Sequence, residues 1–157
     1  MALVGVVIGS KTDADLIQPA LDMLGQLGID YKLSVISGHR NPEKLREYGL
    51  KAEERGLKVI IAAAGGAAHL PGILASWTTL PVIGVPLPTS ELKGIDALLS
   101  IAQMPAGVPV ACVGIGKSGA KNAASLAAQI LGLQYDEIKE AYQEYRQRLE
   151  EGQEVQM

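Results

Sequence analysis

The chain has 157 residues, a formal net charge of −3 and 48% hydrophobic residues. This length and apolar content predict a single packed domain over residues 1–157 and exclude a disordered chain. The acidic balance argues against a basic nucleic-acid-binding face. The only cysteine, Cys112, lies in an apolar run. A disulfide framework is therefore excluded, a small buried side chain is favoured over a reactive thiol, and we expect a cytoplasmic protein.

The sequence shows no pattern typical of a signal peptide or a membrane-spanning segment. Met1 leads directly into the strand-like run Leu3–Ile8, so we expect no signal peptide. No apolar run reaches the length that spans a bilayer, so we expect no association with membranes.

Apolar runs that resemble buried strands alternate with helix-like stretches along the chain. The runs are Leu3–Ile8, Tyr31–Ile36, Lys58–Ala63, Pro81–Val85 and Pro109–Val113. Continuous apolar strands are typical of a parallel sheet that helices cover on both faces. With right-handed crossovers, these units predict an α/β fold: a three-layer αβα sandwich around a five-stranded parallel sheet. We expect the flavodoxin-like strand order 2-1-3-4-5.

Helix signals fall between and after these strands. We expect helices over about 12–27, 42–55, 69–77, 91–103 and 120–131, and an extra C-terminal helix over about 135–151. Thr12 and Asp15 resemble a capping box, and Asn41 followed by Pro42 resembles an N-cap. The last helix carries an apolar stripe, comprising Ile138, Ala141, Tyr142, Tyr145 and Leu149. The alanine-rich stretch Ala120–Leu131 suggests association between chains, and residues 152–157 are expected to fray.

In a parallel sheet all the strands end at one edge, where ligand sites of such folds lie. Polar residues and glycines are concentrated in the segments that follow the predicted strands. These segments are 9–13, 37–41, 64–69, 86–90 and 116–119. Their convergence predicts a site at that edge.

The first of these segments, Gly9–Asp13, combines a glycine with the hydroxyls of Ser10 and Thr12 before a helix. A helix N-terminus favours an anion. Asp13 would repel a phosphate but can accept hydrogen bonds from sugar hydroxyls. The alternative is simple capping of the helix by Thr12 or Asp13.

The second and third segments hold the chain's only histidines. Ser37 and Arg40 offer a hydroxyl and a planar guanidinium to a phosphate, and His39 can act as acid and base. The alternative is a surface histidine on a turn.

In the third segment, Gly65-Gly66-Ala67-Ala68 exposes backbone to a flat ligand, and His69 follows. His69 is a second acid/base, a helix cap, or a hydrogen-bonded structural histidine, which the apolar helix after it favours.

Other signals in the sequence lead to no function. The segment Gly114–Gly119 matches the G-x-G-x-x-G dinucleotide pattern, but it follows the last strand instead of the first. A Walker A loop would need a glycine at position 111, where this chain has alanine. We therefore interpret the segment as a glycine turn whose Lys117 can face the site. The two histidines and one cysteine form no compact ligand set, so we expect no metal. No G-x-S-x-G elbow indicates a serine hydrolase.

Taken together, the motifs resemble the PurE family of purine biosynthesis, in particular its class I branch, the N5-carboxyaminoimidazole ribonucleotide mutases. The resemblance runs from about Val4 to about Leu133. The segments that carry it are Gly9-Ser10-Lys11-Thr12-Asp13, Ser37-Gly38-His39-Arg40-Asn41-Pro42, Ala64-Gly65-Gly66-Ala67-Ala68-His69-Leu70-Pro71-Gly72, Pro81-Val82-Ile83-Gly84-Val85-Pro86 and Ser100-Ile101-Ala102-Gln103-Met104-Pro105.

This resemblance implies a flavodoxin-like homo-octamer that uses no cofactor and no metal. It implies that His39 is the general acid/base that converts N5-carboxyaminoimidazole ribonucleotide into its C4-carboxylated isomer. It also implies which residues bind the ribonucleotide, with Arg40 near its phosphate and Asp13 near its ribose. The substrate-binding residues are Ser10, Asp13, Ser37, Arg40, Gly65, Gly66, Ala67 and His69.

The chain departs from the family pattern at a few small residues, notably Gly38, where alanine is usual. The extra backbone freedom beside His39 bears on loop order and rate more than on the type of reaction. Two alternatives remain. One is direct carboxylation of aminoimidazole ribonucleotide with CO2, which Arg40 and the Gly-Gly-Ala-Ala-His run disfavour. The other is a ribonucleotide-binding module without catalysis.

Overall fold

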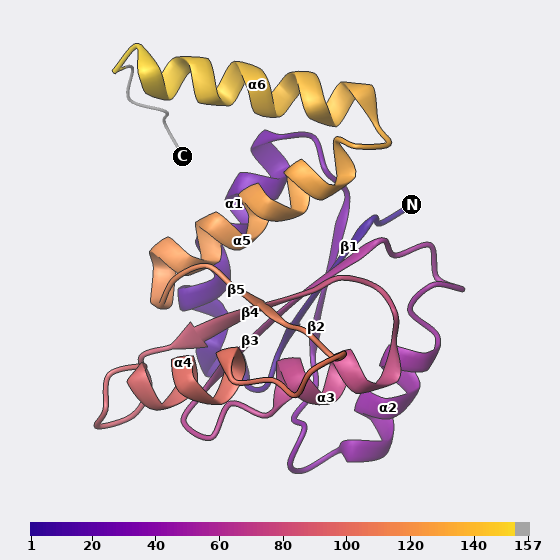
Figure 1. The fold of residues 1–157 in the computed structure, drawn as a ribbon, viewed down its shortest axis with the longest axis vertical. Coiled ribbons are helices and arrows are strands. Elements are labelled where there is room, and N and C mark those ends of the chain that lie inside the picture. The colour runs from indigo at the N-terminus through magenta and orange to yellow at the C-terminus, as the bar shows by residue number, and fades with distance from the viewer. Residues whose placement is uncertain (153–157) are drawn as a thin grey trace.

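The computed structural model describes residues 1–152, which fold around one five-stranded parallel sheet (Figure 1). The strand order is β2-β1-β3-β4-β5, as predicted. The strands are β1 (Val4–Ile8), β2 (Tyr31–Val35), β3 (Val59–Gly65), β4 (Val82–Leu87) and β5 (Ala111–Cys112).

Strand β3 explains why the apolar runs are continuous. Val59, Ile61 and Ala63 point into the core on one face of the sheet, and Ile60 and Ala62 point into the core on the other. All five side chains are fully buried. Because successive residues of a strand face opposite sides, burial on both faces leaves no position for a polar residue.

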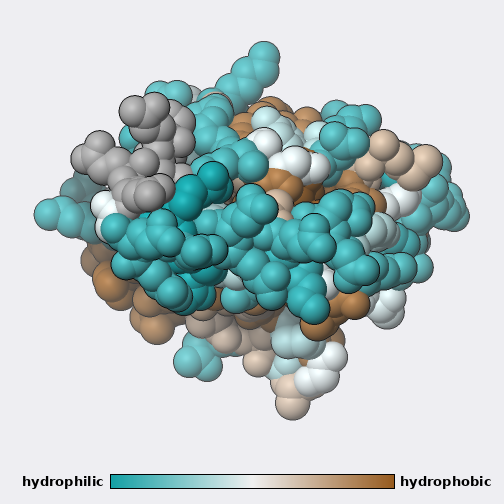
Figure 2. All heavy atoms as spheres, turned by 90° about the horizontal axis from the view of Figure 1, so that it is seen from above, coloured by the Kyte–Doolittle hydropathy of each residue, from teal (hydrophilic) through white to brown (hydrophobic). Residues whose placement is uncertain are grey.

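The helices form two layers, which confirms the predicted sandwich. On one face lie α1 (Ala14–Gln26) and α5 (Gly116–Leu131), with α6 (Asp136–Glu150) packed on the outer side of α5 (Figure 1). On the other face lie α2 (Pro42–Leu50), α3 (Leu70–Trp77) and α4 (Ile95–Ala102). Seen from above α6, the surface is mainly hydrophilic (Figure 2).

The alanines of α5 pack within the chain. Ala120, Ala123, Ala124, Ala127 and Ala128 are all fully buried, in the core that α5 shares with α1 and the sheet. The suggestion that this alanine-rich face associates with another chain is therefore wrong. Its small side chains instead allow two helices of the same chain to approach closely.

Several helix and strand ends differ from the predictions. Helix α2 ends at Leu50, and turns continue to Gly56, which has a φ of 83°. Helix α4 begins at Ile95 instead of near 91, because Lys93 and Gly94 have positive φ angles of 51° and 93°. Strand β5 is only two residues long, and α5 begins at Gly116 instead of Ala120.

The predicted capping arrangements do not form. A 3-10 turn, η1 (Lys11–Asp13), precedes α1, and Ser10 caps it by accepting a hydrogen bond from the Thr12 backbone at 3.3 Å. Asn41 occupies the N-cap position of α2 but makes no side-chain capping bond. In each case the polar side chain lies at the site edge of the sheet, where a ligand can use it.

The C-terminal helix follows its predicted stripe in part. Ile138 and Tyr145 are buried, and Ala141 and Tyr142 pack against the same core, whereas Leu149 is 45% exposed. Of the expected frayed tail, Gly152 closes the last turn through a bond to the Leu149 carbonyl. Positions 153–157 lie outside the described residues. Among residues 1–152, no helix is long and apolar enough to cross a membrane.

The glycine motif at the start of α5 has a packing role. A Cβ atom on Gly119 would overlap the carbonyl group of Gly114, which has a φ of 139°. Loop and helix approach so closely that neither position has room for a side chain, which supports the interpretation as a glycine turn.

We predict that Gly119→Ala destabilises the protein by about 1–3 kcal/mol, because the methyl group meets backbone that cannot rotate away. Gly25→Ala is the matched control within a helix, since a Cβ there contacts nothing within 4 Å. The control should gain about 0.5–1 kcal/mol of stability. Urea unfolding of both variants measures the difference, and equal effects in the two would contradict the packing role.

Candidate active site

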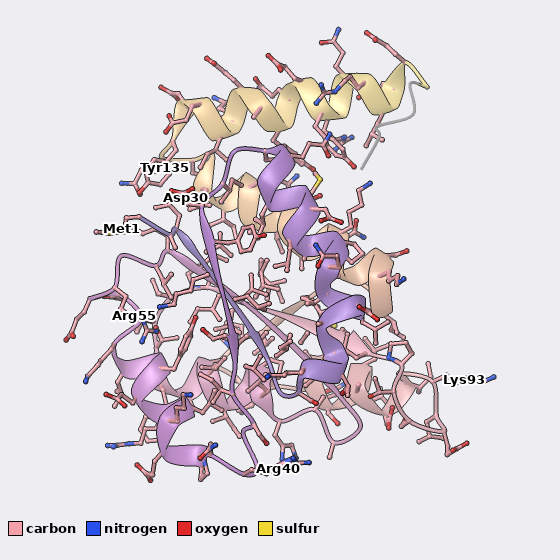
Figure 3. The ribbon with its side chains drawn as sticks, turned by 180° about the vertical axis from the view of Figure 1, so that it is seen from behind. Met1, Asp30, Arg40, Arg55, Lys93 and Tyr135 are labelled. Carbon is pink, nitrogen blue, oxygen red and sulfur yellow. The ribbon has the colours of Figure 1, made fainter. Side chains whose placement is uncertain are left out.

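The strand register brings the loop segments to one edge of the sheet. Ile8 near the end of β1 pairs with Val35 of β2 and Ala63 of β3, and Ala63 pairs with Val85 of β4. The residues that follow these positions therefore leave the sheet side by side. Figure 3 shows Arg40 at the carboxyl edge of the strands, at the other end of the sheet from Met1 and Asp30.

The two histidines meet at this edge. His39 Nε2 lies 2.8 Å from His69 Nδ1, within hydrogen-bonding distance. The rings are nearly perpendicular, at 80°, and their centroids are 4.9 Å apart. Both side chains are exposed to solvent. His69 sits at the N-cap position of α3 but makes no capping bond. The interpretation of His69 as a helix cap is therefore wrong. His39 is exposed on a turn, as in the alternative interpretation, but its ring is paired with His69.

A tight turn presents His39 and Arg40. Ser37 Oγ accepts a hydrogen bond from the Arg40 backbone at 3.2 Å, and the Ser37 carbonyl accepts one from the Asn41 backbone at 2.9 Å. Helix α2 begins directly after, at Pro42. Within residues 1–152, the guanidinium of Arg40 has no hydrogen bond or ion pair, and it remains available to a ligand.

Gly38 lies over a small apolar contact between α2 and α3. A Cβ atom there would lie 3.3 Å from Leu45, 3.7 Å from Ile73 and 3.8 Å from Leu70. Alanine thus fits with a slight shift of the Leu45 side chain. Glycine here gives the backbone beside His39 a wider range of accessible φ and ψ angles than alanine would.

The first loop places Ser10 and Asp13 at the end of β1. Ser10 Oγ accepts hydrogen bonds from both the backbone and the hydroxyl of Thr12, the latter at 2.9 Å. Ser10 provides the cap that we expected from Thr12 or Asp13. The Asp13 carboxylate makes no capping bond. Burial raises its pKa above the ordinary value of 3.8, with only partial compensation from the Ser10 backbone.

The third loop is held against its neighbour from β4. A Cβ atom on Gly65 would overlap the Thr89 hydroxyl, and Gly66 has a φ of 59°. A larger residue is disfavoured at Gly65 by the contact with Thr89 and at Gly66 by the left-handed backbone. Ala67 is exposed and Ala68 is buried just before His69. Thr89 is a neighbour of the site that sequence reasoning did not assign. Its only signal was its place in segment 86–90, which follows the fourth predicted strand.

The segment after β5 contributes fewer residues to the site than we expected. Gly114 and Gly119 serve the packing of α5, and Lys117 is exposed on the first turn of that helix. Cys112 is partly buried, and this burial raises the pKa of its thiol, which disfavours a reactive role.

Two sizeable hollows of the structure lie away from these side chains. A cavity of about 1160 Å³ lies near the opposite edge of the sheet, between Trp77, Pro81 and Pro109. Neither histidine lines it, and the titratable groups that do are Glu53 and Glu54. We therefore place the site by its converging side chains and not by volume. Among residues 1–152, no three metal-ligating side chains are grouped to hold an ion.

The family profile of AIR carboxylase matches residues 3–152 of the chain. The protein belongs to the AIR carboxylase family. The described fold and the site just outlined fall within the matched region.

Curated relatives are similar over nearly the whole chain. A Pseudomonas aeruginosa protein is 57% identical over 145 residues, 92% of this chain and 89% of that protein. A Thermotoga maritima protein is 54% identical over 149 residues, 95% of this chain and 86% of that protein. Both are named N5-carboxyaminoimidazole ribonucleotide mutase.

Solved structures share the fold. The crystal structure of Treponema denticola PurE superposes with a TM-score of 0.84 at 27% identity, over 97% of this chain and 94% of that one. The agreement confirms the predicted family and the flavodoxin-like arrangement of the sheet.

The raised pKa of Asp13 gives a stability prediction. Because folding raises the pKa of this acid, its ionised form costs stability, and the cost is complete above the raised pKa and absent below about 3.8. We expect Asp13→Asn to raise the melting temperature at pH 7. The advantage should shrink as the pH falls toward 3.8 and vanish below it.

Calorimetry across this pH range measures the melting temperatures of the wild type and of Asp13→Asn. Asp15→Asn is the matched control, since Asp15 is exposed on the first turn of α1. An Asp13→Asn variant that is less stable than the wild type at pH 7 would contradict the assignment of a desolvated carboxylate.

Proposed function

We propose that this protein converts N5-carboxyaminoimidazole ribonucleotide into 4-carboxy-5-aminoimidazole ribonucleotide, a step of de novo purine biosynthesis. The observation that carries the proposal is the hydrogen-bonded histidine pair beside a loop of glycines and alanines at the carboxyl edge of the sheet. The names of relatives that are 54% and 57% identical to this chain over the aligned residues support the same reaction.

The isomerisation needs little from the protein beyond positioning and one proton carrier. The bond between N5 and the carboxyl carbon breaks, CO2 leaves, and N5 takes up a proton. C4 then attacks the same CO2, and the proton on C4 leaves. One proton thus moves from C4 to N5. The reaction requires no oxidant, no metal and no nucleoside triphosphate. We assign both transfers to His39 as general acid and then general base.

The remaining assignments follow the placement of the loops. Arg40 and Ser37 are proposed to bind the phosphate, and Asp13 and Ser10 the ribose side of the nucleotide. The loop Gly65–Ala67 has almost no side-chain atoms, so the aminoimidazole ring can lie against its backbone beside His69. Holding CO2 within reach of C4 replaces a bimolecular encounter, and close contact with the ring limits its escape to water.

We further propose that the protein acts as a cytoplasmic homo-octamer without a bound cofactor. The exposed apolar side chains of the α4 region support association, since Leu92, Ile95 and Leu99 are 62%, 53% and 55% exposed in the single chain. Monomeric proteins rarely expose a group of large apolar side chains of this kind.

One alternative has an observation in its favour. The family profile is that of AIR carboxylase, whose description fits direct carboxylation of aminoimidazole ribonucleotide with CO2. Such an enzyme would also carboxylate C4 and would use the same base, His39. It would take its CO2 from solution, and no bond between N5 and a carboxyl carbon would break.

The deciding experiment supplies freshly made N5-carboxyaminoimidazole ribonucleotide without bicarbonate or ATP. Formation of the C4-carboxylate supports the proposal. Turnover only with aminoimidazole ribonucleotide and high CO2 would establish the alternative, and nucleotide binding without turnover of either compound would leave a binding module.

For His39 we predict a loss of turnover without a loss of binding. His39→Asn removes the acid/base group, which contributes about 10²- to 10⁴-fold, so kcat should fall by that range while KM changes little. Steady-state kinetics with N5-carboxyaminoimidazole ribonucleotide make the measurement. Arg40→Ala is the contrast, since loss of a phosphate contact should appear mainly in KM. Near-normal kcat in His39→Asn would remove His39 from its role.

A further inference from the structure

The hydrogen bond between the two histidines constrains the protons that each ring can carry. The bond joins Nε2 of His39 to Nδ1 of His69 at 2.8 Å. Within residues 1–152, neither ring has another hydrogen-bond partner. The outward nitrogens, Nδ1 of His39 and Nε2 of His69, therefore remain available to a ligand. A contact of this length needs one hydrogen between the two nitrogens, since two hydrogens clash and two lone pairs repel.

If His39 acts as an acid, its protonation state determines which of the two rings donates the hydrogen bond. A ring that donates a proton as the imidazolium carries hydrogen on both nitrogens. Its Nε2 can then only donate, and His69 Nδ1 must be the bare acceptor. His69 is in that case the neutral tautomer with its hydrogen on Nε2. No other arrangement satisfies both the charged His39 and the observed contact.

We propose that His69 is the positioning residue of the acid/base, and that the reactive atom of His39 is Nδ1. The inference rests on the proposed function and deepens it. By accepting from His39 Nε2, His69 keeps the second hydrogen of that ring away from the substrate. When the Nδ1 proton passes to N5, the remaining hydrogen is already held on Nε2. Nδ1 is then left bare and can take the proton from C4.

This arrangement removes a step that an unpaired histidine would face. A free neutral imidazole exchanges between two tautomers, and only one has a bare nitrogen toward the ring of the substrate. A fixed partner on the far nitrogen selects the tautomer and the ring orientation, as second partners of functional histidines commonly do. His69 is well suited to this, because it follows the loop Gly65–Ala68 and is anchored by the buried Leu70 at the start of α3.

The test compares His69→Asn with His69→Leu. The two side chains have nearly the same shape, but only the amide oxygen of Asn can replace Nδ1 as the acceptor. We expect His69→Asn to keep kcat within severalfold of the wild type. His69→Leu should lose about 10- to 100-fold in kcat with little change in KM, as is usual when the partner of a functional histidine is removed.

A second readout examines the tautomer directly. In protein with ¹⁵N-labelled histidine, nitrogen chemical shifts distinguish a protonated ring nitrogen from a bare one. At a pH where both rings are neutral, we expect hydrogen on Nε2 and a bare Nδ1 for His39 in the wild type and in His69→Asn, and a mixture of tautomers in His69→Leu. Because His69 is exposed, both variants should fold, and their melting temperatures check this.

The outcomes separate the inference from the proposed function. Equal kcat in His69→Asn and His69→Leu, or a wild-type His39 with hydrogen on Nδ1 and a bare Nε2, overturns the role of His69 while an active wild type retains the function. A wild-type protein that fails to convert N5-carboxyaminoimidazole ribonucleotide overturns the proposed function, and the inference with it.

Discussion

Coverage of the central strands β1, β3 and β4 on both faces is the constraint on which the rest of the structure depends. The central strands are so completely enclosed that positions such as Val6, Ile61 and Ile83 have no contact with water. A polar group there would lose its hydration without a partner, at a cost of about 1–3 kcal/mol in proteins. Functional side chains are therefore confined to the places where strands end. Because all five strands are parallel, their carboxyl ends meet at one edge, and chemistry from separate parts of the chain gathers there.

Close packing of the loops at that edge determines which residues they can use. Gly65 is held so near Thr89 that a methyl group would not fit, and Gly66 adopts a left-handed conformation. Glycine at these positions costs backbone entropy and some stability on folding, but it leaves the backbone beside His69 uncovered by side chains. The Asp13 carboxylate also costs stability, because it is partly desolvated and makes no capping hydrogen bond to the helix. Such local costs are expected where ligand binding competes with stability.

The sequence predicted the layers, the strand order and the convergence of the loop segments at one edge, because those follow from periodicity and from the rule that parallel strands end together. Helix ends were predicted less well. Lys93 and Gly94 interrupt the expected α4 through their backbone conformation, which no apolar pattern reveals. The burial of Ala120 and its neighbours against α1 depends on a tertiary partner, so composition alone suggested a different role. The contact between His39 and His69 likewise depends on the register of β1, β2 and β3, which places residues thirty apart within 2.8 Å.

The exposure of the histidine pair bears on how the proposed reaction keeps CO2 from water. Both rings are open to solvent in the single chain, yet the proposed reaction passes through CO2, which must be kept from water and held near C4. The loop Gly65–Ala67 can cover only one face of the substrate, since it has almost no side-chain atoms. The remaining cover must therefore come from the nucleotide itself, which the proposed contact between Arg40 and its phosphate would hold against the loop.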